Sequence, residues 1–210
     1  CLRRIDPAGN VTTIAGRPDQ PGTVDGEARS SQLKSPNGID CNPAGTTVYF
    51  TQMNHVVRTA TLGVGMNPAY RDSWTIRTIA GLAETSGSLD GSGADARLAG
   101  PSDLVYVSPT SLYLVEFGGN RIRTINRTGH GFDAGDHTVR IISGSLSGTP
   151  GMADSSIGIM AQFNGPLRGA LTASGHLWVT DRENHCIRQV TSTGITTTVC
   201  GTAGSSGYKD

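Results

Sequence analysis

Polar side chains with the chemistry to bind a ligand recur at one place in three successive segments of the chain. The first segment has Gln52 and Asn54, the second has Glu116 and Asn120, and the third has the run Asp181-Arg182-Glu183-Asn184. Amide, carboxylate and guanidinium groups on loops commonly recognise polar ligands. We therefore predict that these residues form a binding face. A second interpretation is that Asp181 and Asn184 hydrogen-bond the backbone of their own turn.

The histidines and acidic residues show no catalytic or metal-binding pattern. His55 and His185 recur with the segments, which indicates a structural role, and the other three follow no His-x-x-x-His spacing: His130, His137 and His176. The stretch 90–95 resembles a calcium loop but lacks the bidentate glutamate, so we predict a turn. The sequence also lacks a nucleophile elbow and a phosphate-binding glycine loop. We predict no catalytic residue, no metal and no cofactor.

Arginine occurs once per segment at a corresponding position. A column of arginines is one arrangement for binding a polyanion, and its members here are Arg3, Arg58, Arg123 and Arg188. However, a single arginine per segment with acidic residues nearby fits a structural role better. The planar guanidinium group has several N–H donors in a fixed fork that can bond neighbouring backbone carbonyls. We predict that role for all four.

Cys186 and Cys200 are candidates for a disulfide. They are expected on adjacent strands of one hairpin, in which pairing Val190 with Ile195 puts Cys186 opposite Val199. A bulge would bring the two cysteines to the Cα separation of about 5.5 Å that a disulfide needs. The alternative is that both remain free thiols.

These residues recur because the sequence repeats itself three times with a period of 65 residues. Pro36, Pro101 and Pro166 mark the period, as do the outer positions His55, Asn120 and His185. Each repeat predicts four short strands with glycine-rich turns between them, and no segment has sustained helical periodicity. In the third repeat the expected strands are 167–173, 176–180, 185–190 and 195–200. Four-stranded antiparallel sheets in tandem stack radially as propeller blades, so we predict an all-β propeller.

Two recurring motifs carry a resemblance to a known family. Asn54-His55-Val56-Val57-Arg58 and Asn184-His185-Cys186-Ile187-Arg188 share one pattern, and the last strand of each repeat ends in a β-branched apolar residue, a small residue and glycine. This pattern resembles the NHL repeat family, which implies a β-propeller of NHL type. The chain departs from the family pattern at two positions. Where the third repeat has Asp181, the second has Glu116 and the first has Gln52, and where the first and third repeats have histidine, the second has Asn120.

The resemblance divides the chain into about three full blades with partial blades at both ends. The expected parts are the outer strands of a partial blade (1–16), three NHL-like blades (17–81, 82–144 and 145–201) and the start of a further loop (202–210). Because such propellers close with about six blades, we expect a piece of a longer propeller. The alternative is a half-propeller that closes by homodimerisation.

Composition argues against two kinds of partner, nucleic acids and the membrane interior. The 210 residues carry 17 basic and 17 acidic side chains and 5% aromatic residues, which argues against nucleic-acid binding. No apolar run approaches the ~20 residues that span a bilayer, so we expect no membrane insertion. The chain starts at Cys1 with neither a methionine nor a signal peptide, and we expect a mature or trimmed piece.

Two sequons add a clue to localisation. Asn10 and Asn126 each begin an Asn-x-Thr triplet in a predicted turn between the third and fourth strands. Glycans there would cover one face of the propeller and leave the opposite, predicted binding face free. Together with four cysteines they favour an extracellular or cell-surface protein, and a cytoplasmic protein is the alternative.

The prediction that follows is a non-enzymatic recognition module that binds a protein or glycan partner through its loop face. The resemblance also admits an enzyme, because some NHL-like propellers are metal-dependent lyases. Such an enzyme needs histidines and a carboxylate that converge on the central channel, and the predicted innermost strands offer no such set.

Overall fold

The computed structural model describes residues 1–129, 131 and 133–207. His130 and the last three residues of the predicted segment 202–210 lie outside them. Four antiparallel sheets follow one another along the chain, and the predicted all-β propeller fold is confirmed. Nearest the N-terminus is a two-stranded sheet of β1 (Leu2–Ile5) and β2 (Val11–Ala15).

Three larger sheets follow it along the chain, and only these three are called the first, second and third sheet. The first has the order β3-β7-β6-β5-β4, made of β3 (Gly26–Glu27), β4 (Pro36–Cys41), β5 (Thr47–Gln52), β6 (Val56–Leu62) and β7 (Trp74–Gly81). The second has the order β8-β12-β11-β10-β9, made of β8 (Gly91–Ser92), β9 (Pro101–Ser108), β10 (Ser111–Glu116), β11 (Arg121–Arg127) and β12 (His137–Ser143). The third has the order β13-β14-β15-β16, made of β13 (Pro166–Leu171), β14 (Leu177–Asp181), β15 (Cys186–Val190) and β16 (Thr196–Cys200). Single 3-10 turns lie at η1 (Arg71–Ser73), η2 (Ala134–Asp136), η3 (Gly158–Met160) and η4 (Arg182–Asn184).

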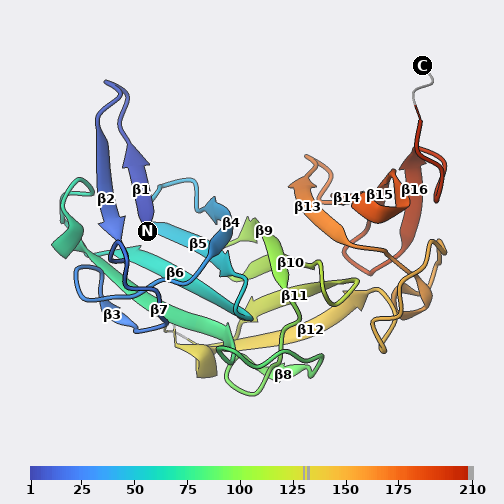
Figure 1. Ribbon diagram of the computed structural model, residues 1–210, viewed down its shortest axis with the longest axis horizontal. Coiled ribbons are helices and arrows are strands. Elements are labelled where there is room, and N and C mark those ends of the chain that lie inside the picture. Colours follow the sequence, from blue (N-terminus) through green and yellow to red (C-terminus); the bar gives the residue numbers. More distant parts are fainter. Residues whose placement is uncertain (130, 132, 208–210) are drawn as a thin grey trace.

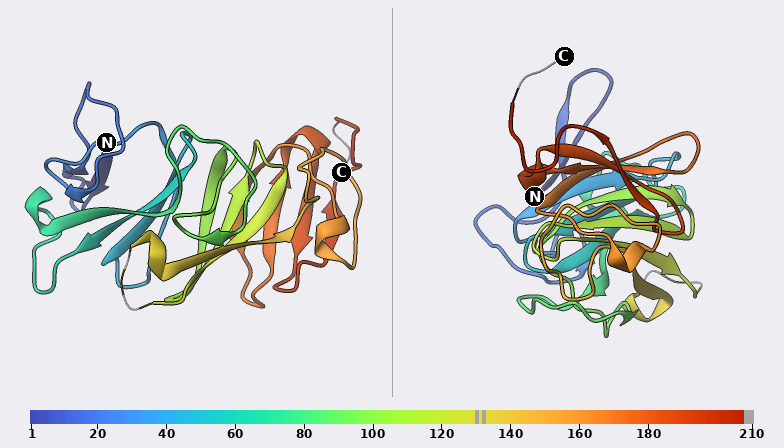
Figure 2. Two further views of the ribbon diagram at one scale, coloured as in Figure 1. Left: turned by 90° about the horizontal axis from the view of Figure 1, so that it is seen from below. Right: turned by 90° about the vertical axis from the view of Figure 1, so that its right-hand side faces the viewer.

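The sheets form an open arc, with β4, β9 and β13 on its concave side (Figure 1). These innermost strands touch one another, β4 against β9 and β9 against β13. Seen along the perpendicular directions, the sheets stand one behind another along the long axis (Figure 2). The start of each innermost strand pairs with the end of the second strand, as Pro36 does with Gln52. The predicted loop face and the starts of the innermost strands therefore lie on the same side of the arc.

The same irregularity occurs in every sheet. The pairing of the third and fourth strands shifts immediately before the repeated arginine, between Val57 and Arg58 in the first sheet and at the corresponding place in the others. A bulge of this kind changes the direction in which the next side chain points. It turns the arginine into the protein, and all three in the larger sheets are fully buried: Arg58, Arg123 and Arg188.

Apolar side chains between neighbouring sheets make up the core. Tyr49 and Val57 of the first sheet pack with Leu98 and Leu104 of the second repeat. The second sheet packs on the third repeat in the same way, and the two-stranded sheet packs on the first. Each cluster joins two successive repeats, so a sheet is stabilised by its neighbour as in other repeat proteins.

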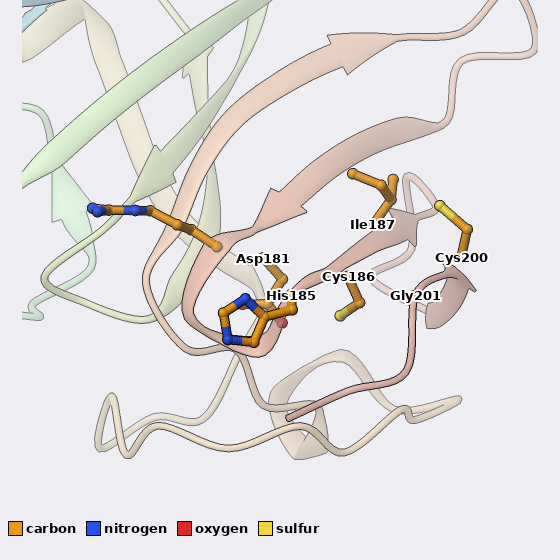
Figure 3. A pocket seen from close by; sticks show the side chains of 7 residues that line it. Asp181, His185, Cys186, Ile187, Cys200 and Gly201 are labelled. Carbon is orange, nitrogen blue, oxygen red and sulfur yellow. The ribbon is translucent and has the colours of Figure 1, made fainter. Parts of the chain in front are cut away.

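The structure contradicts the predicted disulfide, because Cys186 and Cys200 are both free. The hairpin does contain a bulge, but it pairs Cys200 with Ile187 instead of with Cys186. Successive side chains of a strand point to opposite faces. The two thiols consequently lie on different sides of the sheet and point apart (Figure 3).

The position of one sequon also differs from the prediction. Asn10 lies exposed at the end of a turn, where its amide donates to Asp6. Asn126 was expected in a turn but lies in β11, opposite Thr138, because that strand continues to Arg127. Among the described residues, no helix is long and apolar enough to cross a membrane.

Candidate functional site

The repeated arginines hold each sheet to the loop that precedes it. Arg58 donates from Nη1 to the carbonyl of Gln32 at 2.7 Å and from Nη2 to the carbonyl of Val24 at 2.8 Å, and it forms an ion pair with Asp25. Arg123 and Arg188 make the corresponding contacts in their own repeats. The predicted structural role is confirmed for these three.

The same network includes several of the residues predicted for the binding face. Gln52, Glu116 and Asp181 occupy one position in the three repeats, and each lies within 3.4 Å of the guanidinium of its own arginine. All three side chains are fully buried. The carboxyl or amide group is therefore directed at the arginine and away from solvent.

The two asparagines beside this network are also buried. Asn54 accepts a hydrogen bond from Gln52 and donates one to Glu84. Asn184 donates to Asp181 and to the carbonyl of Gly151. Of the predicted run in the third repeat, Arg182 and Glu183 remain on the surface, 3.5 Å apart.

Burial perturbs the acids in this network. It raises the pKa of Glu116 to about 7, although Arg123, the N–H of Ala99 and Arg121 act in the opposite direction. Burial likewise raises the pKa of Asp181. In the second repeat, Oε2 of Glu116 and Nη1 of Arg121 have no hydrogen-bond partner among the described residues. The second repeat therefore contains a buried carboxylate and two arginines that are not fully satisfied.

The outer positions of the repeat connect successive sheets. Nδ1 of His55 accepts a hydrogen bond from the N–H of Gly100 at 3.1 Å, and Oδ1 of Asn120 accepts one from the N–H of Gly165 at 2.8 Å. Both residues have a positive φ, which aims the side chain at the next repeat. His185 has the same conformation, with φ 57°, and its side chain is exposed. The predicted structural role therefore holds for His55.

A second polar cluster lies at the starts of the three innermost strands, and we call it the rim. Arg168 donates from Nη1 to the carbonyl of Ser102 at 2.8 Å and from Nη2 to Oδ1 of Asn37 at 3.2 Å. Its guanidinium is 3.8 Å from Asp103. Arg168 comes from β13, Asp103 from β9 and Asn37 from β4, so three repeats contribute to one cluster.

One side of the rim is exposed to solvent, and the other side is buried and held by hydrogen bonds. Arg168 and Asn37 are exposed, whereas Asp103 is nearly buried and accepts a hydrogen bond from the N–H of Gly169 at 3.0 Å. Burial raises the pKa of Asp103, and the N–H groups of Gly169 and Leu104, together with Arg168, partly oppose the shift. The buried acid helps to fix the arginine, which presents N–H donors next to the amide of Asn37.

Sequence reasoning missed the rim. Asn37 follows its repeated proline by one residue, and Asp103 and Arg168 follow theirs by two. The position two residues after the proline is Gly38 in the first repeat, so its chemistry differs in all three repeats. A position that changes chemistry between otherwise similar repeats was the available signal. What the sequence did not show is that residues 131 positions apart, Asn37 and Arg168, are in contact.

A cavity of about 200 Å³ lies at the end of the third sheet, next to Gly201 (Figure 3). Its lining includes His185, Cys186 and Cys200. Burial raises the pKa of the Cys186 thiol, and Asp181 adds to that shift, so this cysteine is not an activated thiolate. Within the described ranges, no group of three or more His, Cys, Asp or Glu residues is arranged to hold a metal ion.

Comparison with known proteins supports the fold. The model of the NHL repeat matches residues 163–190. An auxiliary nutrient binding protein from Bacteroides thetaiotaomicron is similar with a TM-score of 0.67 and 19% identity over 89% of this chain and 42% of that one. One from Bacteroides ovatus has a TM-score of 0.68 and 18% identity over 94% and 43%. Virginiamycin B lyase from Staphylococcus aureus has a TM-score of 0.50 and 18% identity over 94% and 47%.

The chain spans less than half the length of each of these structures. No curated protein sequence matches it. At these identities the likeness shows the fold and not the activity. The matched repeat includes the second and third strands of the third sheet together with Asp181 and Arg188. The chain is thus a propeller-type repeat protein that carries an NHL repeat at residues 163–190.

Proposed function

We propose that the protein is a non-enzymatic recognition module, extracellular or at the cell surface, that binds a glycan or protein partner at the rim. The observation that carries this proposal is the contact between Asn37 and Arg168, which joins the first repeat to the third beside Asp103. A cluster assembled from three repeats has a fixed shape. Fixed polar groups bind with a smaller loss of conformational entropy than mobile ones do.

The chemistry of the rim suits a ligand with many hydroxyl or amide groups. Arg168 and Asn37 offer N–H donors to solvent, and the amide of Asn37 also offers an acceptor oxygen. A hydroxyl group both donates and accepts, so it can pair with both kinds of group at once. The two nutrient binding proteins with this fold are in keeping with a binding role.

The test is to screen the chain against immobilised glycans and extracellular proteins and to measure the affinity of any ligand by calorimetry. We expect Arg168→Ala to weaken binding by about tenfold or more, since a hydrogen bond to a charged group contributes about 1.5–3 kcal/mol. Arg140→Ala is the matched control, because that exposed arginine lies on β12, away from the rim. Loss of binding in Arg182→Ala with full binding in Arg168→Ala would place the site on the β14–β15 loop instead.

The second candidate is a metal-dependent lyase, which the likeness to virginiamycin B lyase favours. Incubation of the chain with candidate peptidyl substrates and a panel of divalent cations, followed by mass spectrometry, tests it. Metal-dependent turnover that Asp103→Asn abolishes would replace the binding proposal with an enzymatic one. The proposed location is checked separately by mapping glycans at Asn10 and Asn126 in the protein isolated from its source.

A further inference from the structure

One short segment makes the contact between successive sheets in every repeat. It has a small residue, then any residue, then a large apolar residue, and it ends two positions later in Gly-Pro or Ser-Pro. The three copies are 31–36, 96–101 and 161–166. Its small and its large residue are buried in all three: Ser31 and Leu33, Ala96 and Leu98, Ala161 and Phe163. We call it the docking segment.

In two of the three copies, the large residue of the docking segment lies on the glycine that follows or ends the last strand of the preceding sheet. A Cβ atom on Gly81 would be 3.1 Å from Cδ1 of Leu98, and one on Gly16 would be 3.0 Å from Cδ1 of Leu33. Both glycines also have a positive φ. The preceding sheet therefore offers a shallow seat, formed by the absence of a side chain, in which the apolar residue rests.

The residue before the proline makes the second contact. Its backbone N–H donates to the outer position of the preceding repeat, from Gly100 to His55 and from Gly165 to Asn120. The acceptor is an imidazole nitrogen in one case and an amide oxygen in the other. The requirement at this position is therefore an acceptor on a residue with positive φ, and both side chains meet it.

The preceding sheet contributes a face that the next repeat covers. Tyr49 and Tyr113, at the centre of the second strands, are 5% and 4% exposed. Val57 and Ile122 on the third strands, and Ala80 and Ser143 on the fourth, are fully buried. The clusters that contain the two tyrosines also contain Leu98 and Phe163 of the following docking segments.

The third sheet presents the same set of groups uncovered. Trp178 replaces the tyrosine and is 42% exposed, Ile187 is half-buried, and Cys200 is exposed where Ala80 and Ser143 are not. The cavity of about 200 Å³ lies next to Gly201, the counterpart of Gly81 (Figure 3). In the described part of the chain, no hydrogen bond reaches the imidazole of His185, the counterpart of His55.

We propose that this face of the third sheet binds a polypeptide segment of the form Ala/Ser-x-Leu/Phe-x-Gly/Ser-Pro. The large residue enters the cavity beside Gly201, the N–H before the proline donates to His185, and the small residue allows close approach to the sheet. Two established interfaces of the same chain, between the first and second sheets and between the second and third, provide the geometry. The proposal is independent of the rim.

The test uses a synthetic peptide with the sequence of residues 94–102 and follows alkylation of Cys200 by mass spectrometry. We expect the peptide to lower the alkylation rate of Cys200 at least fivefold at saturation while the rate at exposed Cys41 stays unchanged. A peptide with Ala in place of Leu98 should bind at least tenfold more weakly, because it loses the buried apolar group. His185→Ala should weaken binding several-fold, and His185→Asn should retain it, since Asn120 makes the same contact.

Because a nine-residue peptide binds weakly, a second measurement joins it to the C-terminus through a flexible linker, which raises its effective concentration to the millimolar range. Protection of Cys200 in this chain, and its loss when Leu98 of the segment is changed to Ala, supports the proposal. Equal alkylation in the two linked chains would overturn it. A concentration-dependent dimer in light scattering, with Cys200 protected in the absence of peptide, would also overturn it, because a second copy would then be the occupant.

Discussion

At the scale of single residues, Glu116 is the buried acid whose pKa burial raises to about 7. Its counterpart in the first repeat is Gln52, which makes the same contact with an arginine through a neutral amide. A carboxylate in this position must give up its hydration, and burial is the largest cause of its raised pKa. The second repeat thus has an ionisable carboxyl group at the position where the first repeat has a neutral amide that hydrogen-bonds the arginine.

A pH dependence of stability follows from this residue. The pKa of Glu116 is about 7 in the folded protein and near 4.5 in the unfolded chain. The folded state therefore holds the proton more tightly, so this contribution to stability is complete below about pH 4.5 and is lost as the pH rises to about 7. The loss is at most about 3 kcal/mol, since one pKa unit corresponds to ~1.36 kcal/mol.

Glu116→Gln should remove that dependence. We expect the variant to unfold at a higher urea concentration than the wild type at pH 8 and at nearly the same concentration at pH 4.5, because Gln52 shows that an amide fits the site. Urea titrations followed by circular dichroism at both pH values measure this. A variant that is less stable at pH 8 would mean that Arg121 and Arg123 need the negative charge more than the site resists it.

Residue chemistry also sets how far sequence reasoning could reach. The repeated arginines could be assigned a structural role because one cation per repeat with acids nearby is what a repeated hydrogen-bond network requires. The polar residues Gln52, Asn54 and Asp181, at or just after strand ends, could not be distinguished from surface groups, since their burial depends on the arginine folding back over them. The disulfide prediction failed because a single bulge decides which face a cysteine occupies.

At the scale of elements, one hydrogen bond from the outer position of each repeat contributes to the contact between sheets. Asn120→Ala removes both the acceptor for the N–H of Gly165 and the donor to the carbonyl of Gly148, so we expect a loss of about 1–3 kcal/mol. Asn120→His should recover the part of the loss that comes from the bond to Gly165, because His55 makes the equivalent bond. Urea unfolding of the three chains at pH 8 gives the comparison.

The same pair of variants yields a control for mechanism. An imidazole that gains a proton cannot accept a hydrogen bond at Nδ1, so the recovery in Asn120→His should fade between pH 8 and pH 5. If Asn120→His is no more stable than Asn120→Ala at any pH, the contact acts through shape and not through the hydrogen bond.

Strand positions followed from the sequence more closely than the contacts between strands did. Alternating apolar residues and glycine turns predicted the second strand of the third repeat at 176–180, within about one residue of β14. The rim was not predictable in this way, because it depends on how β4, β9 and β13 converge across repeats. Convergence is a property of the arc, and the spacing of residues along one strand does not contain it.

At the scale of the whole molecule, each sheet depends on the one that follows it. In a repeat protein the stability is close to a sum of the stabilities of the repeats and of the contacts between neighbours. The second sheet has a neighbour on both faces, and the third has one on a single face in the described residues. Equivalent substitutions in the two sheets should therefore have unequal effects.

Tyr113 and Trp178 make this comparison direct, since both lie at the centre of the second strand of their sheets and pair with the residue after the repeated arginine. Tyr113 is 4% exposed and packs against Phe163 and Leu177, whereas Trp178 is 42% exposed. We expect Tyr113→Ala to cost about 3–5 kcal/mol, as for other buried aromatic residues, and Trp178→Ala to cost less than about 1 kcal/mol. Urea unfolding measures both. Equal losses would mean that Trp178 is covered in solution. In that case its face would already be occupied, and the peptide of residues 94–102 should not bind there.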